Sequence, residues 1–331
     1  MTVRRSEHGF SLAELMISMA IMLVIAGAAT SALLRMTSAQ ATIWNRTQMH
    51  SGIRGATEVL QQEVGQAGRI AIPNTIKLTA GVTGGTAAQT VAISCTSTCT
   101  GSPPISPVTG IYQTVKLVVD GSTTQETVTV TGVDSTANTI TAIFKNNHAA
   151  NASVRVLGAF ASGVVPPEAS PSSYTNGSNG SVLKLYGDIN ADGNMVYVEY
   201  TCDTTAGNLY RNSVTISPSA TKTQATASQI LLSNITTNPD LSPCFTYQIA
   251  AINGRYFVTD VAITLTVQTQ LVDPVTKQFQ KETKALLNVS QRNVFNVWTV
   301  ASLGITERIQ EMPAIVTALL PCPWRSGGVC S

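Results

Sequence analysis

Charged side chains are scarce in this chain. Only 11% of its 331 residues are Asp, Glu, Lys or Arg, whereas about 25% is usual in soluble domains. The formal net charge is +2, and no cluster of Lys or Arg follows the first few residues. A protein that binds nucleic acid needs a basic face or stripe, so we do not expect a nucleic-acid partner.

Catalytic signatures are missing as well. The sequence contains no GxSxG, HExxH, GxxxxGK[ST] or GxGxxG motif, each of which marks a common class of active site or nucleotide site. Its three histidines, His8, His50 and His148, are scattered. We therefore expect that the protein is not an enzyme.

A long uncharged run does occur near the amino terminus. No side chain from Leu15 to Leu34 is charged, and about 20 such residues are enough for a helix to cross a bilayer. Arg4 and Arg5 precede the run and Arg35 follows it. The positive-inside rule then places the leader in the cytoplasm and the rest of the chain outside.

Glu14 lies at the start of this apolar segment and bears on whether the segment is removed as an ordinary secretory signal or stays on the mature protein. In an ordinary secretory signal the small residues "GAATSA" at 27–32 would be the cleavage site. A carboxylate near the centre of a bilayer costs about 2.5–3.5 kcal/mol and persists mainly where it has a partner. Close to the end of the segment the cost falls, and a glutamate without function at the interface is the simpler alternative.

The stretch "GFSLAELMISMA", Gly9 to Ala20, resembles the class III leader of type IV prepilins. The resemblance implies that a prepilin peptidase cleaves between Gly9 and Phe10 and methylates the new amine of Phe10. It also implies that Glu14 neutralises such an amine on a neighbouring subunit during assembly. A buried charge that is paired in this way is tolerable, whereas an unpaired one is strongly destabilising.

The helix is predicted to continue beyond the membrane, over residues 10–68, with 10–34 as its transmembrane part. Apolar residues recur at steps of three or four, which draws one stripe along the helix. The stripe consists of Met49, Ile53, Ala56, Leu60, Val64 and Ala67. Gly65 and Gly68 supply stop signals.

Beyond the leader, 1–9, and the helix, the pattern changes to short β-type runs. We expect a Thr-rich β region at 69–165, which is a candidate insertion, and a linker at 166–181 that is rich in Pro, Gly and Ser. A β-sheet head follows at 182–295. Its clearest strand alternates apolar and polar residues from Val261 to Leu271, and "VDPVTK" turns the chain into a returning strand at 279–289.

The predicted fold class is therefore α+β and similar to type IV pilins. A long amino-terminal helix, transmembrane and then amphipathic, packs on an antiparallel β-sheet head with a β-rich insertion. A tail at 296–331, with a short helical candidate and two cysteines, ends the chain.

Six cysteines in an exported chain favour disulfides over metal ligation, because the CxxC pairs of zinc sites are absent. Six cysteines allow many pairings. Local spacing suggests Cys95 with Cys99, Cys202 with Cys244, and Cys322 with Cys330.

The segment "DINADGNMVYVE" fits the acidic calcium-loop pattern. Its candidate ligands for Ca²⁺ are Asp188, Asn190, Asp192, Asn194 and Glu199. The flanking sequences look like strands, so the loop is not part of a helix-loop-helix unit, and Glu199 lies deep in the second strand. The alternative is a β-hairpin whose turn uses Asp and Gly for positive φ. We expect calcium as a cofactor of this loop.

The stretch from Leu183 to Asn212, with the later "LLNVSQRN", resembles PilW-type minor pilins. The resemblance implies a minor pilin that primes type IV pilus assembly, with adhesion and twitching motility as associated activities. Its partners would be other pilins and minor pilins, the prepilin peptidase and the inner-membrane assembly platform. We expect a single-pass inner-membrane protein with a periplasmic head, which later enters a surface pilus. The alternatives are a pseudopilin of a type II secretion system, and a tip module for adhesion or DNA uptake.

Overall fold

The computed structural model describes residues 11–99, 106–120, 124–217, 220–222 and 229–321. The chain forms two compact units, of which the first comprises Met1–Ser51 with Gln268–Glu282 and the second comprises Gly52–Val267 with Thr283–Ser331. The helix α1, Leu12–Gln66, contributes to both units. Its observed ends lie two residues inside the predicted range of 10–68.

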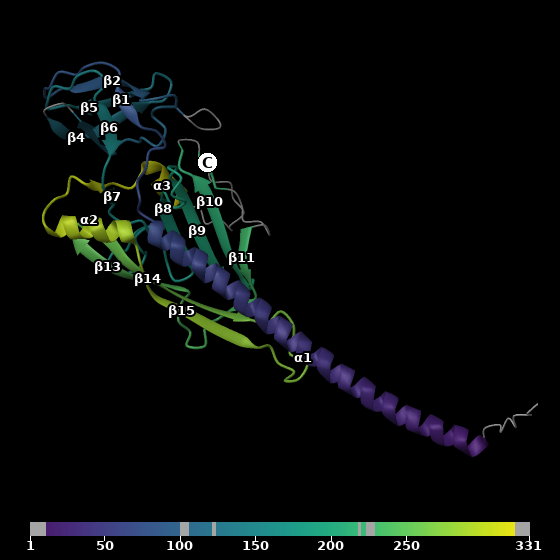
Figure 1. The fold of residues 1–331 in the computed structure, drawn as a ribbon. Helices are drawn as coiled ribbons and strands as arrows, with labels where there is room; N and C mark the ends of the chain where they lie inside the picture. The colour runs from purple at the N-terminus through teal and green to yellow at the C-terminus, as the bar shows by residue number, and fades with distance from the viewer. Residues whose placement is uncertain (1–10, 100–105, 121–123, 218–219, 223–228, 322–331) are drawn as a thin grey trace, which may run out of the picture. The chain divides into compact units, whose positions relative to one another are not determined.

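The first unit contains the amino-terminal part of α1 (Figure 1). Hydroxyl groups within the apolar run donate to carbonyl oxygens one turn earlier, as Ser18 does to Glu14 (2.7 Å) and Thr30 to Ala26 (2.8 Å). Such bonds satisfy polar side chains inside the helix itself. The hydroxyl groups therefore leave the run with an apolar surface.

The other part of this unit is the loop 268–282. The strand predicted to reach Leu271 ends at Gln268, and Leu271 is 62% exposed. The chain leaves the ladder because Thr269 turns it: the Thr269 hydroxyl donates to the Leu271 carbonyl (2.9 Å) and accepts from the Gln280 amide (3.1 Å). The returning strand begins at Lys281, two residues later than predicted. Within the unit, Arg46 of α1 donates to the Gln280 side chain.

The second unit begins with the carboxyl-terminal part of α1, where the predicted apolar stripe is confirmed from Ile53 to Ala67. Met49, the first residue of the predicted stripe, lies in the first unit and is only half-buried. Ile53, Ala56, Leu60, Val64 and Ala67 are all at most 2% exposed. The helix stops at Gly68, which has a φ of +82° that only glycine adopts readily. The Gly68 amide donates to the carbonyl of Tyr186 (3.0 Å), so the end of α1 is tied to the head.

Six strands of the second unit close into a barrel in the order β1-β2-β5-β4-β3-β6, with antiparallel pairing throughout (Figure 1). The side chains alternate as a barrel wall requires: along β4, Val128 and Val130 are buried while Thr127 and Thr129 are exposed. The strands are β1 (Ile76–Leu78), β2 (Ala88–Cys95), β3 (Lys116–Asp120), β4 (Gln125–Asp134), β5 (Thr139–Ile143) and β6 (Ser153–Val156). The Thr-rich region predicted at 69–165 contains this barrel.

Three further sheets and two short helices complete the described part of the unit. One sheet has the order β11-β10-β9-β8, and in another β14 pairs with β12, β13 and β15. Their strands are β8 (Val182–Gly187), β9 (Val196–Asp203), β10 (Asn208–Thr215), β11 (Ile230–Ser233), β12 (Ile235–Thr236), β13 (Phe245–Ile252), β14 (Arg255–Gln268) and β15 (Lys281–Ser290). β7 (Ala159–Phe160) pairs in parallel with β16 (Ile309–Gln310), and the helices are α2 (Arg292–Ser302) and α3 (Ala314–Leu319).

The apolar face predicted for β14 is confirmed, because Val261, Ile263, Leu265 and Val267 are at most 1% exposed, but Thr266 on the other face is buried as well. The hairpin of β14 with β15 is present as well. With a long amino-terminal apolar helix and antiparallel sheets in the head, the fold is α+β and type IV pilin-like.

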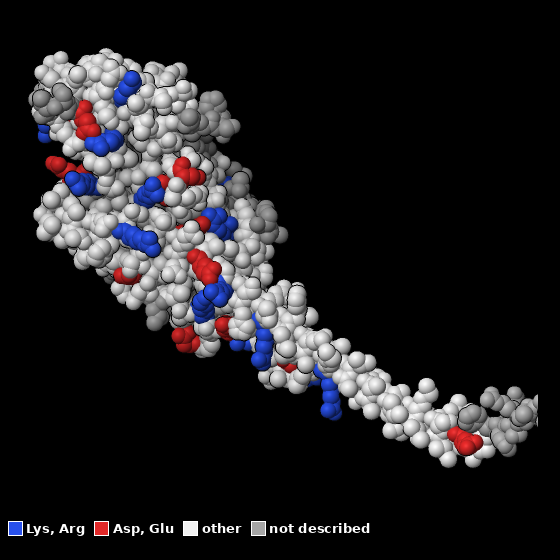
Figure 2. All heavy atoms as spheres, in the orientation of Figure 1, with Lys and Arg blue, Asp and Glu red and all other residues white. Residues whose placement is uncertain are grey.

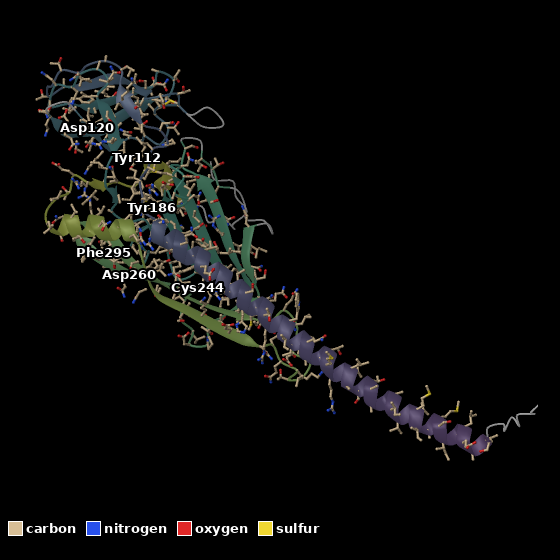
Figure 3. The ribbon with its side chains drawn as sticks, viewed as in Figure 1. Tyr112, Asp120, Tyr186, Cys244, Asp260 and Phe295 are labelled. Atoms are coloured by element: carbon tan, nitrogen blue, oxygen red, sulfur yellow. A yellow bond between two sulfur atoms is a disulfide. The ribbon has the colours of Figure 1, made fainter. Side chains whose placement is uncertain are left out.

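The barrel and the sheet of β8 and β9 share one hydrophobic core. Phe160 joins them: its ring centroid lies 6.4 Å from that of Tyr112 and 4.9 Å from that of Tyr186. Tyr112 and Tyr186 are labelled in Figure 3. The segment 166–181, expected to be a linker, also lies inside this unit, where the Glu168 amide donates to Ser178 (2.9 Å) and Ser178 is fully buried. The division into domains at this segment stays a prediction.

Candidate assembly site on the amino-terminal helix

The amino-terminal part of α1 is an uncovered apolar surface. It is long and apolar enough to cross a membrane, and none of its most apolar window is buried. Large side chains such as Met22, Leu23 and Val24 are each more than 70% exposed. In Figure 2 this stretch is uncharged between one acidic side chain near its end and the first basic one. An aqueous environment penalises such a surface, so it needs lipid or protein around it.

Glu14 lies in the first turn of α1 and makes a reciprocal contact with Ser11. The Ser11 amide donates to Glu14 Oε2 (3.1 Å), and the Glu14 amide donates to the Ser11 hydroxyl (3.2 Å). This is a capping box, in which two amides without helical partners are satisfied at once. Its signature, Ser-x-x-Glu, is present in "SLAE", and capping is a role of Glu14 that was not predicted from it.

The carboxylate of Glu14 is available to pair with a cation from another molecule. No cation within the described residues pairs with it, and the side chain is exposed. A carboxylate in the first turn interacts favourably with the positive end of the helix dipole. The same carboxylate can therefore cap its own helix and attract a cation from outside. Gly9 and Phe10, the predicted cleavage residues, lie outside the described residues.

The apolar surface of the first unit continues past Leu34. Thr37, Gln40, Ala41 and Trp44 of α1 and Leu271 of the loop line a groove of about 610 Å³. Trp44 is 72% exposed and Val275 is 70% exposed. Sequence reasoning did not single out Trp44, although a tryptophan on a helix face with low charge was the available signal.

At the other end of α1, a buried charge cluster attaches the helix to the head. Glu63 is 8% exposed and accepts hydrogen bonds from Arg211 of β10 and from the Tyr200 hydroxyl of β9. The shortest Arg211 contact is 2.5 Å. Burial and the Glu63 carboxylate raise the pKa of Tyr200 well above its usual value. Burial lowers the pKa of Arg211, but the hydrogen bond and charge of Glu63 outweigh it and raise that pKa.

This cluster was missed from the sequence. The available signal was a glutamate, Glu63, beside the apolar stripe between Leu60 and Val64. A carboxylate at that position is buried when the stripe docks, and a buried carboxylate needs a partner.

The predicted calcium ligands are not gathered around one point. Asp188 is fully buried, and its Oδ1 accepts from the amides of Asp192 (3.1 Å) and Gly193 (3.3 Å), while Arg69 lies 3.4 Å from Oδ2. Glu199 instead contacts Lys222 (2.8 Å) within the sheet. Among the described residues there is no group of three or more His, Cys, Asp or Glu side chains that could hold a metal.

The inclusion of Glu199 in the site is therefore wrong, because its strand register places it opposite Lys184 rather than at the loop. The loop forms the turn of the β8–β9 hairpin, with Gly193 at a φ of +86°. Calcium binding by Asp188, Asn190, Asp192 and Asn194 stays a prediction.

Two of the suggested cysteine pairs are disulfides in the structure. Cys95 is joined to Cys99, and Cys202 is joined to Cys244 across 42 residues. Cys322 and Cys330 lie outside the described residues.

Residues 4–30 match the family model described as the prokaryotic N-terminal methylation motif. The match includes Gly9, Phe10, Glu14 and most of the uncharged run. Comparisons with curated proteins and with solved structures found no match.

Proposed function

Because the amino terminus carries a type IV prepilin class III leader, we propose that this protein is a minor pilin of the PilW type that enters a type IV pilus through α1. The observation that carries the proposal is that the methylation motif, with Glu14 inside it, leads directly into an uncovered apolar helix. A secretory signal removed after the apolar run would leave none of these on the mature protein.

The location of the subunit follows from the same features. Before assembly the apolar helix spans the inner membrane, with the leader in the cytoplasm and the head in the periplasm. On assembly, contacts with other pilins replace lipid around the helix. The prepilin peptidase and the inner-membrane assembly platform are the partners that this route requires.

Mass spectrometry of the mature amino terminus tests the first step. We expect a chain that starts at a methylated Phe10 in cells that contain the peptidase, and an uncleaved chain when Gly9 is replaced by Leu. A mature chain that starts at Met1, or beyond Ala32, would contradict the proposal.

A second experiment separates a pilus subunit from a secretion pseudopilin. Cells that lack the protein should lose surface filaments that can be sheared off, and wild-type filaments should contain it in small amounts. Normal filaments together with secreted proteins retained in the periplasm would assign it to a type II secretion system.

A tip-located binding module is the second candidate, and a charged cleft favours it. A cavity of about 430 Å³ lies between the barrel strands β3 and β4 and the segment 305–308. In a chain with 11% charged residues, five of its lining residues are charged: Lys116, Glu126, Lys145, Glu307 and Arg308. A recess with basic and acidic side chains is visible at the left edge of Figure 2.

Substitution of these charges tests the module better than removal of the barrel, because removal would expose the shared core around Tyr186. Lys145→Glu with Arg308→Glu should abolish adhesion and leave filaments intact if the cleft binds an anionic surface ligand. Unchanged adhesion by filaments that contain the double variant would reject this second function.

A further inference from the structure

Three polar side chains lie in one row across the sheet of β8, β9 and β10. Lys184 pairs with Glu199, and Glu199 pairs with Asn212. Directly paired residues of antiparallel strands project to the same face, with Cβ atoms about 4.5–5.5 Å apart. All three residues are at most 6% exposed. A lysine, a glutamate and an amide therefore share a buried face.

A second lysine reaches this row. The Lys222 Nζ lies 2.8 Å from Glu199 Oε2, and the Tyr197 hydroxyl donates to the same oxygen at 2.8 Å. The Lys222 side chain is 2% exposed, and its Nζ is 5.0 Å from the centroid of the Tyr197 ring. Lys184, in contrast, directs its Nζ to the carbonyls of Asn176 and Leu320. Of the two amines, only that of Lys222 contacts the carboxylate next to Asn212.

Asn212 is the unusual member of the row. Its side-chain Oδ1 and Nδ2 are both buried, and neither has a hydrogen-bond partner among the residues that the structure describes. A buried amide without partners costs about 1–3 kcal/mol for each unsatisfied group. Native proteins rarely keep such groups unless they have a chemical role or a missing partner.

The surroundings favour the nucleophilic form of the amine. Burial lowers the pKa of Lys222, although the charge and hydrogen bond of Glu199 oppose this effect. Proton transfer from Lys222 to Glu199 converts the ion pair into a neutral amine and a carboxylic acid. Burial makes the charged form of the Lys222 amine costly, which favours its deprotonation.

We propose that Lys222 and Asn212 become joined by an amide bond between their side chains, with Glu199 as the proton carrier. Glu199 first takes a proton from the Lys222 ammonium, and the neutral Nζ attacks the side-chain carbonyl carbon of Asn212. The bond from that carbon to Nδ2 breaks, and the attacking nitrogen gives up one proton to the leaving nitrogen.

The reaction balances without an oxidant or another reactant. The Lys222 ammonium, the Glu199 carboxylate and the Asn212 amide give a secondary amide, a protonated Glu199 and ammonia. The product removes the unpaired Nδ2 and leaves Glu199 as a neutral donor to the new carbonyl oxygen. The cross-link does not depend on the proposed assembly function, and either can fail alone.

Mass spectrometry of the full-length protein extracted from membranes tests the cross-link. After reduction of its disulfides the chain should be lighter than its processed sequence by about 17 Da, the mass of one ammonia. Trypsin should no longer cleave after Lys222, so residues 212–255 should appear as one peptide that carries the whole loss. A chain with no mass loss, fully cleaved after Lys222, would overturn the proposal.

Variants identify the reacting groups. Lys222→Met, Asn212→Ala and Glu199→Gln should each restore the full mass expected for its sequence, whereas Lys184→Arg, the matched control, should keep the loss of about 17 Da. Cyclisation of Asn212 onto its own backbone gives the same mass change. In that case the mass loss would persist in Lys222→Met, and trypsin would still cleave after Lys222 in the wild type. That result would also reject the proposal.

Discussion

At the scale of single residues, Glu14 combines two roles that one substitution separates. Glutamine also completes a capping box, so Glu14→Gln keeps the contact with Ser11 and removes only the charge. We expect normal leader cleavage and about tenfold or greater loss from filaments, because the partner amine would be buried without a counter-charge. Immunoblots of sheared filaments and of membranes measure the ratio of assembled to membrane-stored protein.

Ser11→Ala is the matched control for this prediction. It removes the hydroxyl cap, at a cost of about 1 kcal/mol of helix stability, but leaves the carboxylate in place. The variant should still enter filaments. Normal assembly of Glu14→Gln combined with failure of Ser11→Ala would show that the cap, and not the charge, is what matters.

Removal of the charge of Glu63 should affect the stability of the head. Glu63→Gln leaves Arg211 partly buried without a counter-charge, so we expect a loss of about 2–3 kcal/mol in the free energy of unfolding. Thermal unfolding of the detergent-solubilised protein measures it. The exposed Arg54–Glu58 pair on the same helix supplies the control, because Glu58→Gln should change stability by no more than about 0.5 kcal/mol. Equal effects of the two variants would refute a special role for Glu63.

At the scale of elements, α1 was the most predictable part of the chain. Its uncharged run and its apolar stripe follow from the order of residues alone, because helix periodicity needs no tertiary information. The end of β14 was not predictable. Leu271 continues the apolar alternation, but the hydrogen bonds of Thr269 turn the chain before it, and those bonds depend on the loop that follows.

The surface that Trp44 contributes to α1 leads to a prediction at this scale. Trp44→Ala should reduce incorporation into filaments severalfold without loss of head stability, because the side chain is 72% exposed and contributes mainly to contacts with other subunits. Leu303, which is 74% exposed on the second unit, is the control, and Leu303→Ala should assemble normally. Equal incorporation of both variants would show that the groove lined by Trp44 and Leu271 does not contribute to assembly.

At the scale of the whole molecule, buried tyrosines make the head sensitive to alkali. Burial is the main cause that raises the pKa of five phenols: Tyr112, Tyr186, Tyr197, Tyr200 and Tyr247. Their contribution to stability is complete below the ordinary pKa of about 10 and is lost as the pH rises above it.

Buried lysines act in the opposite direction. Burial lowers the pKa of Lys116 and Lys184, so their unfavourable contribution disappears as the pH rises to about 10.4. Above that pH only the tyrosine effect remains. We expect the melting temperature to fall steeply there, with phenolate absorbance that appears together with unfolding. Independent, gradual ionisation of the tyrosines at constant stability would contradict this.

The leader, the apolar helix with Glu14, the β character of the head and two cysteine pairs that the structure joins could all be predicted from the order of residues. These features depend on local periodicity, on spacing and on a short motif. Three others became visible only in the fold: which strands close into a barrel, that Glu63 meets Arg211 and Tyr200, and that Glu199 faces Asn212 and Lys222 rather than the Asp188 loop. Those contacts join residues far apart in the chain, so they depend on how helices, strands and loops pack together and not on the pattern within any one segment.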